Sequence, residues 1–515
     1  MKEITVNDIN KAVKGIQDKW YSILPPNEIE FRKPGRIRDP IHGYHKLLEI
    51  DFALLDIPPL QRLRYISQLG FVNKIYPGAN HTRFEHSIGV AAVAERIMNA
   101  LREKHQKMEP RIKIKRDDIW TVKIAGYVHD IGHLPFSHGS EKIFEVLGIG
   151  KKISKEFNLG DDYKPHELFS YLMTKTEYIK EVLKKVSDKC ELNLDAERVA
   201  ETILGRLKGE KRYLSDIIHS HTDADRIDYL LRDGYYTGVP HGHVDIEHLA
   251  RSFCVVKQNR SIWLGIEERG LEAVEALYSS RDVMYPTVYF HHTNRIAEAM
   301  LTRTLYYAHR DEKMDILELL GLNDAELIAR INEIGYEEVV NKLLYRRLHK
   351  RIFVIRPRDI EYKGERVDKL LSKNDSEAMD LAGEINDFFS SWDQLMKFEE
   401  EIISDSNVNE LNEGGLLIDI PSNFITLPKT EADLIPEDYL PVRLRQGGTE
   451  YIWKLSPIIV GIETRSKYLR SNVIVATDCS IKGSNLDKIR KAFKEKIESM
   501  FQIKLLPSAF FKRNL

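Results

Sequence analysis

The sequence predicts a mainly α-helical protein whose last part mixes helices with short strands. Apolar residues recur with a helical period of about 3.6 in segments such as residues 87–98 and 121–128, between loops marked by glycine, proline and asparagine. After about residue 404 the pattern changes to short apolar runs at residues 415–420, 451–455 and 471–476, which are typical of strands.

Composition and spacing divide the chain into four segments. These are a polar lead-in over residues 1–35, a helical core over residues 36–310, a charged helical extension over residues 311–403, and a smaller α+β C-terminal lobe over residues 404–515. Within the core, residues 271–308 predict one long helix with a kink at Pro286, because proline removes a backbone donor. The lobe is expected to close with an amphipathic helix over residues 484–501.

The composition is that of a globular protein with more than one core. A chain of 515 residues, 42% hydrophobic and 30% charged, is neither disordered nor embedded in a membrane. Its net charge of -2 provides no general basic field, so nucleic-acid binding is not expected.

The cysteine content and the N-terminal sequence indicate the cellular compartment of the protein. The chain has 3 cysteines and no CxxC pair, which argues against a disulfide framework or a thiolate zinc site and indicates a reducing compartment. There is no apolar signal segment and no run of the roughly 20 apolar residues that span a bilayer. We therefore expect a cytoplasmic protein without a membrane partner.

Two histidines and two aspartates form the most specific chemical pattern in the chain. His86, His129, Asp130 and Asp225 together suit a divalent cation with open positions for water and a phosphate, and iron, manganese, zinc or magnesium would all be compatible. Residues 129–138 hold three histidines in a segment interrupted by glycine and proline, which is hard to explain as packing. The pattern indicates a metal-dependent phosphohydrolase.

Asp225 begins a helical pattern that adds polar groups to the same site. Asp225, Tyr229 and Asp233 follow one another at intervals of four residues, so they are expected to project from one helix face.

The chain resembles a known family at five motifs that occur in the right order. It is similar to HD-domain deoxynucleoside triphosphate (dNTP) triphosphohydrolases, in particular the bacterial and archaeal relatives of the vertebrate sterile-alpha-motif dNTPase. The motifs are Arg38-Asp-Pro-Ile-His-Gly-Tyr, Gln61-Arg-Leu-Arg-Tyr-Ile-Ser-Gln-Leu-Gly, Arg83-Phe-Glu-His-Ser, His129-Asp-Ile-Gly-His-Leu-Pro-Phe-Ser-His, and Asp225-Arg-Ile-Asp-Tyr-Leu-Leu-Arg-Asp. The resemblance covers roughly residues 36–310 and implies an HD-domain helical core.

The resemblance implies a reaction and its catalytic residues. The four predicted ligands would hold a catalytic cation, and water would attack the α-phosphate to release a deoxynucleoside and inorganic triphosphate. His138 matches the general acid of the family, and Glu141 can reach its imidazole if this turn is helical. His133 and His166 match further active-site histidines that bind phosphate or assist the acid.

Further positions match the substrate-binding residues of the family. Three arginines and a tyrosine match phosphate contacts, namely Arg83, Arg226, Arg281 and Tyr229. Four residues match those that exclude ribose, namely Gln68, Leu69, Asp233 and Tyr289. Tyr285 stands where the family has a histidine, which leaves the preference among the four dNTPs open.

A regulatory nucleotide site is also implied by the resemblance. Asp56, Gln61 and Arg64 occupy the positions of a guanine-specific activator site that neighbouring subunits complete in the family. Activation by GTP or dGTP would then be allosteric and linked to a homotetramer, because a ligand favours the oligomer that contains its site.

Two other functions stay open on the residues alone. An HD-type phosphodiesterase or nucleotidase, acting on a cyclic nucleotide or a nucleoside monophosphate, could use His133, His138 and His166 as ligands of a second metal. A non-catalytic dNTP sensor would bind nucleotide without turnover. The sequence of the C-terminal lobe indicates no ligand.

Overall fold

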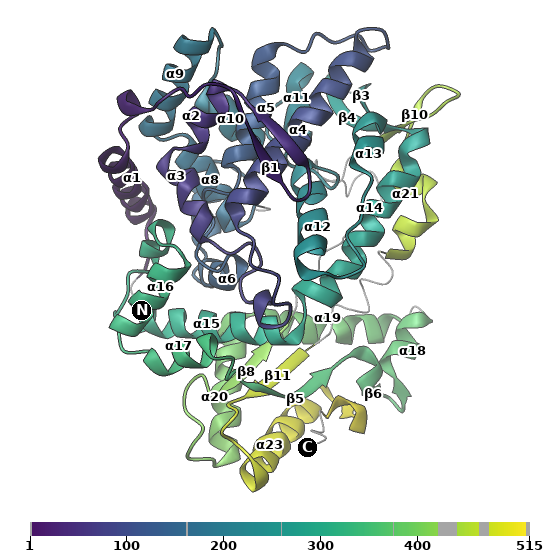
Figure 1. Cartoon of the computed structure of the whole chain (residues 1–515). Coiled ribbons are helices and arrows are strands. Elements are labelled where there is room, and N and C mark those ends of the chain that lie inside the picture. The colour runs from purple at the N-terminus through teal and green to yellow at the C-terminus, as the bar shows by residue number, and fades with distance from the viewer. Residues whose placement is uncertain are drawn as a thin grey trace. The chain divides into compact units, whose positions relative to one another are not determined.

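The computed structural model describes residues 3–160, 163–258, 260–373, 375–420, 440–462 and 473–510 and shows a mainly α-helical protein (Figure 1). The chain forms two compact units. The first unit comprises Met1–Met284, His309–Arg330 and Leu427–Val460, and the second comprises Tyr285–Ala308, Ile331–Thr426 and Gly461–Leu515. The domain boundaries predicted at residues 35, 310 and 403 stay predictions.

Helices make up most of the first unit. They are α1 (Val6–Ile23), α2 (Glu49–Leu55), α3 (Pro58–Arg62), α4 (Arg83–His105), α5 (Arg116–Val128), α6 (His138–Val146), α7 (Ile149–Glu156), α8 (Pro165–Thr174), α9 (Glu177–Cys190), α10 (Ala196–Ile203), α11 (Arg212–Asp216), α12 (Ala224–Thr237), α13 (Ile246–Ser252), α14 (Leu271–Met284) and α21 (Ile452–Leu455), with α16 (Asp324–Glu333) beginning in this unit.

The core of the first unit is the packing of α4 against α5 and α12, which Figure 1 shows near one another. Most residues of α4 are buried, from Arg83 in its first turn to Leu101 near its end. Gly126 permits the close approach of α5, because a Cβ at this position would lie 2.9 Å from the Cα of Ala91 on α4. Three helix ends are thereby brought together, and these ends carry the predicted metal ligands.

Two small sheets complete the first unit. A hairpin pairs β1 (Gly35–Asp39) with β2 (Gly43–Leu47) in antiparallel register. A second sheet has the order β10-β9-β4-β3, with β3 (Phe253–Gln258), β4 (Ser261–Glu267), β9 (Pro441–Arg443) and β10 (Thr449–Tyr451), and only the β4–β9 pair among these described strands is parallel. Strands β9 and β10 thus pair with the first unit, although they lie in the segment predicted as the C-terminal lobe.

The second unit packs helices against two three-stranded sheets. The sheets have the orders β5-β11-β8 and β12-β6-β7. The elements are α15 (His292–Arg310), α17 (Glu337–Leu344), β5 (Lys350–Ile355), β6 (Ile360–Tyr362), β7 (Glu365–Arg366), α18 (Val367–Ser372), α19 (Ser376–Ser390), α20 (Trp392–Ser406), β8 (Leu416–Asp419), β11 (Val473–Thr477), α23 (Gly483–Phe501) and β12 (Lys504–Leu505). Its apolar core joins these sheets to α19, α20 and α23 around buried aromatic rings such as Phe353 and Phe493.

Most local expectations for the last part of the chain are confirmed. The run at residues 415–420 forms β8, and the closing helix is α23. The run at residues 471–476 forms β11 from Val473 onward, while residues 471 and 472 lie outside the described residues.

Three local predictions were wrong. Residues 451–455 were expected to form a strand, but β10 ends at Tyr451 and the following residues form the short helix α21. Residues 271–308 do not form one kinked helix, because α14 ends at Met284 and a π-helical turn over Tyr285–Tyr289 precedes α15. The extension expected to be helical contains β5, β6 and β7.

Within the described part of the chain, every helix falls short of the length and apolar character that a membrane crossing requires.

Candidate metal centre

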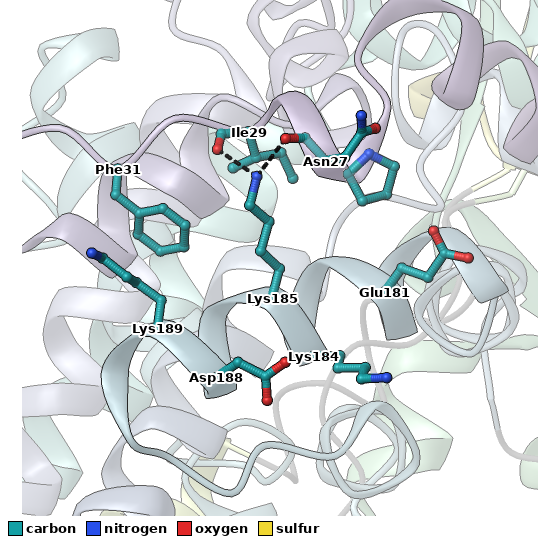
Figure 2. Close-up of a pocket in the computed structure, with 9 residues that line it drawn as sticks. Asn27, Ile29, Phe31, Glu181, Lys184, Lys185, Asp188 and Lys189 are labelled. Carbon is teal, nitrogen blue, oxygen red and sulfur yellow. Dashed lines mark hydrogen bonds between the residues drawn. The ribbon is translucent and has the colours of Figure 1, made fainter.

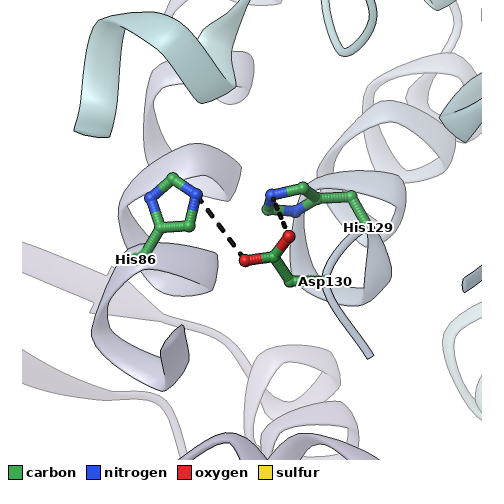
Figure 3. A group of neighbouring side chains, drawn as sticks. All are labelled: His86, His129 and Asp130. Atoms are coloured by element: carbon green, nitrogen blue, oxygen red, sulfur yellow. Dashed lines mark ion pairs between the residues drawn. The ribbon is translucent and has the colours of Figure 1, made fainter. Parts of the chain in front are cut away.

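Four predicted metal ligands converge in the first unit. His86 lies in the first turn of α4, His129 and Asp130 follow the end of α5, and Asp225 lies in the first turn of α12. The Asp130 carboxylate lies between the two imidazoles (Figure 3), with its oxygens 3.2 Å from His129 Nε2 and 3.8 Å from His86 Nε2. Asp225 Oδ1 lies 2.9 Å from His86 Nε2 and 3.8 Å from His129 Nε2.

The geometry of these four side chains fits a cation. His129 Nδ1 lies 2.8 Å from the carbonyl oxygen of Gly126, which favours a proton on Nδ1 and a free lone pair on Nε2. This Nε2 is buried and has no hydrogen-bond partner among the described residues. A buried nitrogen acceptor that receives no hydrogen bond and lies beside two carboxylates suits a metal ligand, so His86, His129 and Asp130 could hold a metal ion.

The charges of the cluster are strongly coupled. Burial opposes the charged form of Asp130, but the Arg83 guanidinium, with Nη1 2.6 Å from Oδ2, holds the pKa of this carboxyl well below its usual range. Burial also opposes the charged form of His86, yet Asp225 and Asp228 raise its pKa to about 10. A concentration of negative charge around an imidazole favours a cation at this position.

The local chain conformation explains how Asp225 reaches the cluster. Asp223 caps α12 by accepting a hydrogen bond from the backbone N–H of Arg226 at 2.7 Å, which begins the helix one residue before Asp225. The Asp223 carboxylate also pairs with the Arg226 guanidinium at 2.9 Å.

A second cluster gathers three histidines around one buried carboxylate. Glu141 on α6 contacts Nδ1 of His133, Nδ1 of His138 at 3.0 Å and Nδ1 of His166 at 2.9 Å. The turn is helical, as the expected contact between Glu141 and His138 requires. His133, Glu141 and His166 also form a group that could hold a metal ion.

Protonation in this second cluster follows burial and charge. Burial works to raise the pKa of Glu141, but the imidazoles, His133 first, bring it well below its usual range. Burial and the nearby Arg83 lower the pKa of His133 to about 4, whereas Glu141 overcomes burial and raises the pKa of His166. His138 is the accessible member, since its side chain is 59% exposed while those of the other two are nearly covered.

The backbone before His138 is held in a strained turn. Phe136 and Ser137 have φ angles of 55° and 54°, which cost non-glycine residues about 1–3 kcal/mol each. Asp324 Oδ1 accepts a hydrogen bond from the Phe136 N–H at 2.7 Å, and Arg83 Nε donates to Ser137 Oγ at 2.7 Å. These bonds hold the turn and thereby position His138.

The predicted phosphate-binding residues have partners of their own. Arg83 is buried and bound to Asp130 and Ser137, and Arg226 is bound to Asp223. Arg281 is buried on α14, which packs against α12. Tyr229 is half-buried on α12, on the face expected from its spacing from Asp225.

Part of the predicted sugar-binding group comes together in the first unit. The Gln68 N–H donates to the His81 carbonyl at 3.1 Å, and His81 Nε2 lies 2.8 Å from Asp233 Oδ1. The Gln68 side-chain oxygen is buried and has no hydrogen-bond partner among the described residues. Leu69 is half-buried beside Gln68.

Tyr285 and Tyr289 fall in the second unit. Their rings meet edge to face at 5.0 Å in the π-helical turn. Their assignment to the substrate site stays a prediction.

The three predicted activator residues are partly accessible. Arg64 Nε donates to Gln61 Oε1 at 2.9 Å, and the Arg64 guanidinium lies 3.6 Å from the centre of the Phe84 ring. Asp56 pairs with Arg32 at 2.8 Å. Their assignment to a nucleotide site stays a prediction.

Comparison with known proteins identifies the family. Residues 83–233 match the model of the HD domain, and residues 244–387 match that of the HD-associated region. An uncharacterised protein of Methanocaldococcus jannaschii is 30% identical over 394 residues, which cover 73% of this chain and 74% of that protein. The chain belongs to the HD-domain family.

Some relatives of this HD-domain protein carry a named activity. The deoxynucleoside triphosphate triphosphohydrolase SAMHD1 of Danio rerio is 32% identical over 334 residues, which cover 59% of this chain and 50% of SAMHD1. The SAMHD1 of Homo sapiens is 29% identical over 300 residues, with 55% and 45% covered. The chain therefore spans about half the length of these relatives.

A buried charged group beside the candidate metal centre was not predicted from the sequence. Asp39, His42, Asp228 and Arg232 are all buried, and Asp228 contacts His86. Burial opposes the charge of Asp228, but Arg232 holds its pKa well below the usual range. The motifs place Asp228 and Arg232 three and seven residues after Asp225 on one helix, but the spacing does not indicate the contact with His86.

A separate hollow of about 790 Å³ lies between residues 26–31 and α9 (Figure 2). Lys185 Nζ donates to the backbone oxygens of Asn27 and Ile29 at 2.8 and 2.9 Å. Two carboxylates, Glu181 and Asp188, offset two of the three lysines of the lining. No predicted site residue lies in this lining, and its chemistry does not point to a ligand.

Proposed function

We propose that this HD-domain protein is a metal-dependent triphosphohydrolase of deoxynucleoside triphosphates. The observation that carries the proposal is the convergence of His86, His129, Asp130 and Asp225 within the HD domain. The SAMHD1 relatives, which are named as dNTP triphosphohydrolases, support the substrate class.

The proposed reaction breaks the bond between the α-phosphorus and the 5′-oxygen. A divalent cation held by the four ligands would supply a water of lowered pKa and would screen the charge of the phosphate. Water oxygen bonds to the α-phosphorus, the 5′-oxygen leaves with a proton from His138, and the products are a deoxynucleoside and inorganic triphosphate. Glu141 keeps the His138 imidazole oriented through its Nδ1 contact.

The remaining site residues are proposed to bind and select the nucleotide. Arg83, Arg226, Arg281 and Tyr229 would contact the phosphates. Gln68, Leu69, Asp233 and Tyr289 would exclude ribose, and Tyr285 would contact the base. The unpaired, buried Gln68 oxygen supports this reading, because a buried acceptor without a partner costs about 1–3 kcal/mol until a donor such as a sugar hydroxyl reaches it.

A second candidate function has one specific observation in its favour. Because His133, Glu141 and His166 could hold a metal ion, a two-metal phosphodiesterase or nucleotidase is the alternative. That enzyme would release phosphate or a nucleoside monophosphate and would produce no triphosphate.

Product analysis distinguishes these functions and tests activation. We expect a mixed dNTP pool with Mn²⁺ to yield deoxynucleosides and triphosphate, measured by mass spectrometry, with a higher rate when GTP is present. GTP should also convert the chain to a tetramer in light scattering, and Asp56→Ala should remove both effects of GTP while leaving the basal products unchanged. Turnover of a cyclic nucleotide or a nucleoside monophosphate in a parallel assay, with no triphosphate released from the dNTP pool, would support the alternative. Nucleotide binding without turnover would support a sensor.

A further inference from the structure

Asp228 contacts the face of His86 that points away from the other predicted ligands. Its Oδ2 lies 2.7 Å from His86 Nδ1, whereas His86 Nε2 faces Asp225 at 2.9 Å. An imidazole that binds a metal is neutral, with a proton on one nitrogen and the lone pair of the other directed at the metal. With the proton on Nδ1 and directed at Asp228, the lone pair lies on Nε2 and points into the metal centre.

Asp228 is held from three directions and has no freedom to turn. Arg232 donates to both of its oxygens at 2.9 Å, and His42 Nε2 lies 2.5 Å from Oδ1. The side chains of all three residues are fully buried. Four donor groups, including His86 Nδ1, therefore converge on one carboxylate.

The hairpin turn between β1 and β2 anchors this group. Asp39 Oδ2 accepts from Arg232 Nη1 at 2.8 Å, while Asp39 Oδ1 accepts from the backbone N–H groups of Ile41 and His42 at 2.8 Å each. The same turn thus supplies His42 and holds Arg232. A continuous set of contacts leads from the hairpin to a predicted metal ligand.

The absence of a side chain at Gly89 makes room for this set. Gly89 lies three residues after His86 on α4, and a Cβ there would lie 1.9 Å from Asp228 Oδ1 and 2.4 Å from Arg232 Nη2. These distances are far below van der Waals contact. Any other residue at this position would displace the Asp228–Arg232 pair from α4.

We propose that Asp228 is the positioning residue that fixes the tautomer and orientation of His86 for metal binding, and that the β1–β2 turn holds Asp228 through His42, Arg232 and Asp39. The inference rests on the proposed metal centre and deepens it. It makes metal affinity depend on residues that do not touch the metal. It also links the hairpin to the catalytic cation through Asp228 and His86.

The first test replaces Asp228 by asparagine, which has the same shape. The asparagine amide group presents an N–H donor where four donors already converge. Either the Arg232 guanidinium or His86 Nδ1 therefore loses its acceptor. We expect the affinity of the metal-stripped full chain for Mn²⁺, measured by calorimetry, to fall about 10–100-fold. Excess Mn²⁺ should restore turnover, which the loss of a purely structural contact would not allow.

A matched control is available for this substitution. Asp118 is also buried, and it pairs with Arg198 and with Lys211 at the start of α5, away from His129 at the other end of that helix. Asp118→Asn is expected to lower the thermal midpoint without changing the affinity for Mn²⁺.

The second test leaves every charged side chain in place. Gly89→Ala inserts one methyl group between α4 and the Asp228–Arg232 pair, and we expect it to weaken Mn²⁺ binding to a similar extent. Gly15→Ala on α1 is the control, because nothing lies within 4 Å of a Cβ at that position. It should leave Mn²⁺ binding unchanged.

A measurement on the wild-type chain covers the case in which either variant fails to fold. With isotope-labelled histidine and Zn²⁺ bound, nuclear magnetic resonance is expected to show the His86 proton on Nδ1, with the signal assigned by its loss in His86→Gln. A proton on Nε2 would overturn the inference, and so would wild-type Mn²⁺ affinity in the folded Asp228→Asn and Gly89→Ala chains. Failure of the wild-type chain to bind any divalent cation would instead contradict the proposed metal centre.

Discussion

Replacing Asp225 by alanine is expected to remove bound Mn²⁺ and turnover together. Asp225 Oδ1 approaches both His86 Nε2 and His129 Nε2, so its loss leaves two imidazoles and one carboxylate to hold the cation. Because the metal contributes several kcal/mol to the reaction, turnover should fall by about a thousandfold or more. Elemental analysis after dialysis and the rate of triphosphate release measure the two effects on one sample.

A control separates metal binding from the stability of α12. Asp225 is an acidic residue in the first turn of its helix, where negative charge is favourable, and Glu247 occupies the same kind of position in α13. Glu247→Ala should keep metal and turnover. If Asp225→Ala retained a full complement of metal, Asp225 would not belong to the ligand set.

Replacing His138 by alanine is expected to separate metal binding from catalysis. Among the described residues, His138 contacts Glu141 and the rings of His133 and His166 but none of the four predicted ligands, so the metal should stay bound. The leaving 5′-oxygen would lose its proton donor, and turnover should fall by about 10²–10⁴-fold. Measurements of metal content and of the single-turnover rate at saturating dNTP check both parts.

The matched control removes another exposed imidazole from the first unit. His248 lies on α13 and is exposed, so His248→Ala should leave turnover unchanged. Normal turnover by His138→Ala would show that another group donates the proton. Parallel loss of metal would show that His138 supports the metal centre instead.

The four candidate metal ligands could be selected from the sequence because their signals are local, and their assignment to a metal stays a prediction. His86 begins a helix, His129 and Asp130 end one, and Asp225 follows the helix cap Asp223, so each signal lies within a few residues. The role of Asp228 could not be predicted in this way. It is defined by its contact with His86, which lies 142 residues earlier in the chain.

In the fold, too, local features could be predicted and contacts between distant segments could not. The helices of the core follow from apolar spacing, whereas β5 pairs with β11 more than a hundred residues later, which no local pattern in residues 311–403 indicates. The apolar run after Tyr451 was ambiguous because a short apolar segment suits a strand or a buried helical turn. Proline at position 286 lacks a backbone N–H, which predicts a break in the helix. It does not predict that the break takes the form of a π-helical turn.

The most direct test of the proposed function follows the oxygen of the attacking water. Metal-stripped chain is incubated with a dNTP in oxygen-18 water, before and after addition of Mn²⁺, and the products are analysed by mass spectrometry. We predict no turnover before Mn²⁺, and afterwards an unlabelled deoxynucleoside with one labelled oxygen in the triphosphate. Label in a nucleoside monophosphate or in the deoxynucleoside, or equal turnover without metal, would contradict the account.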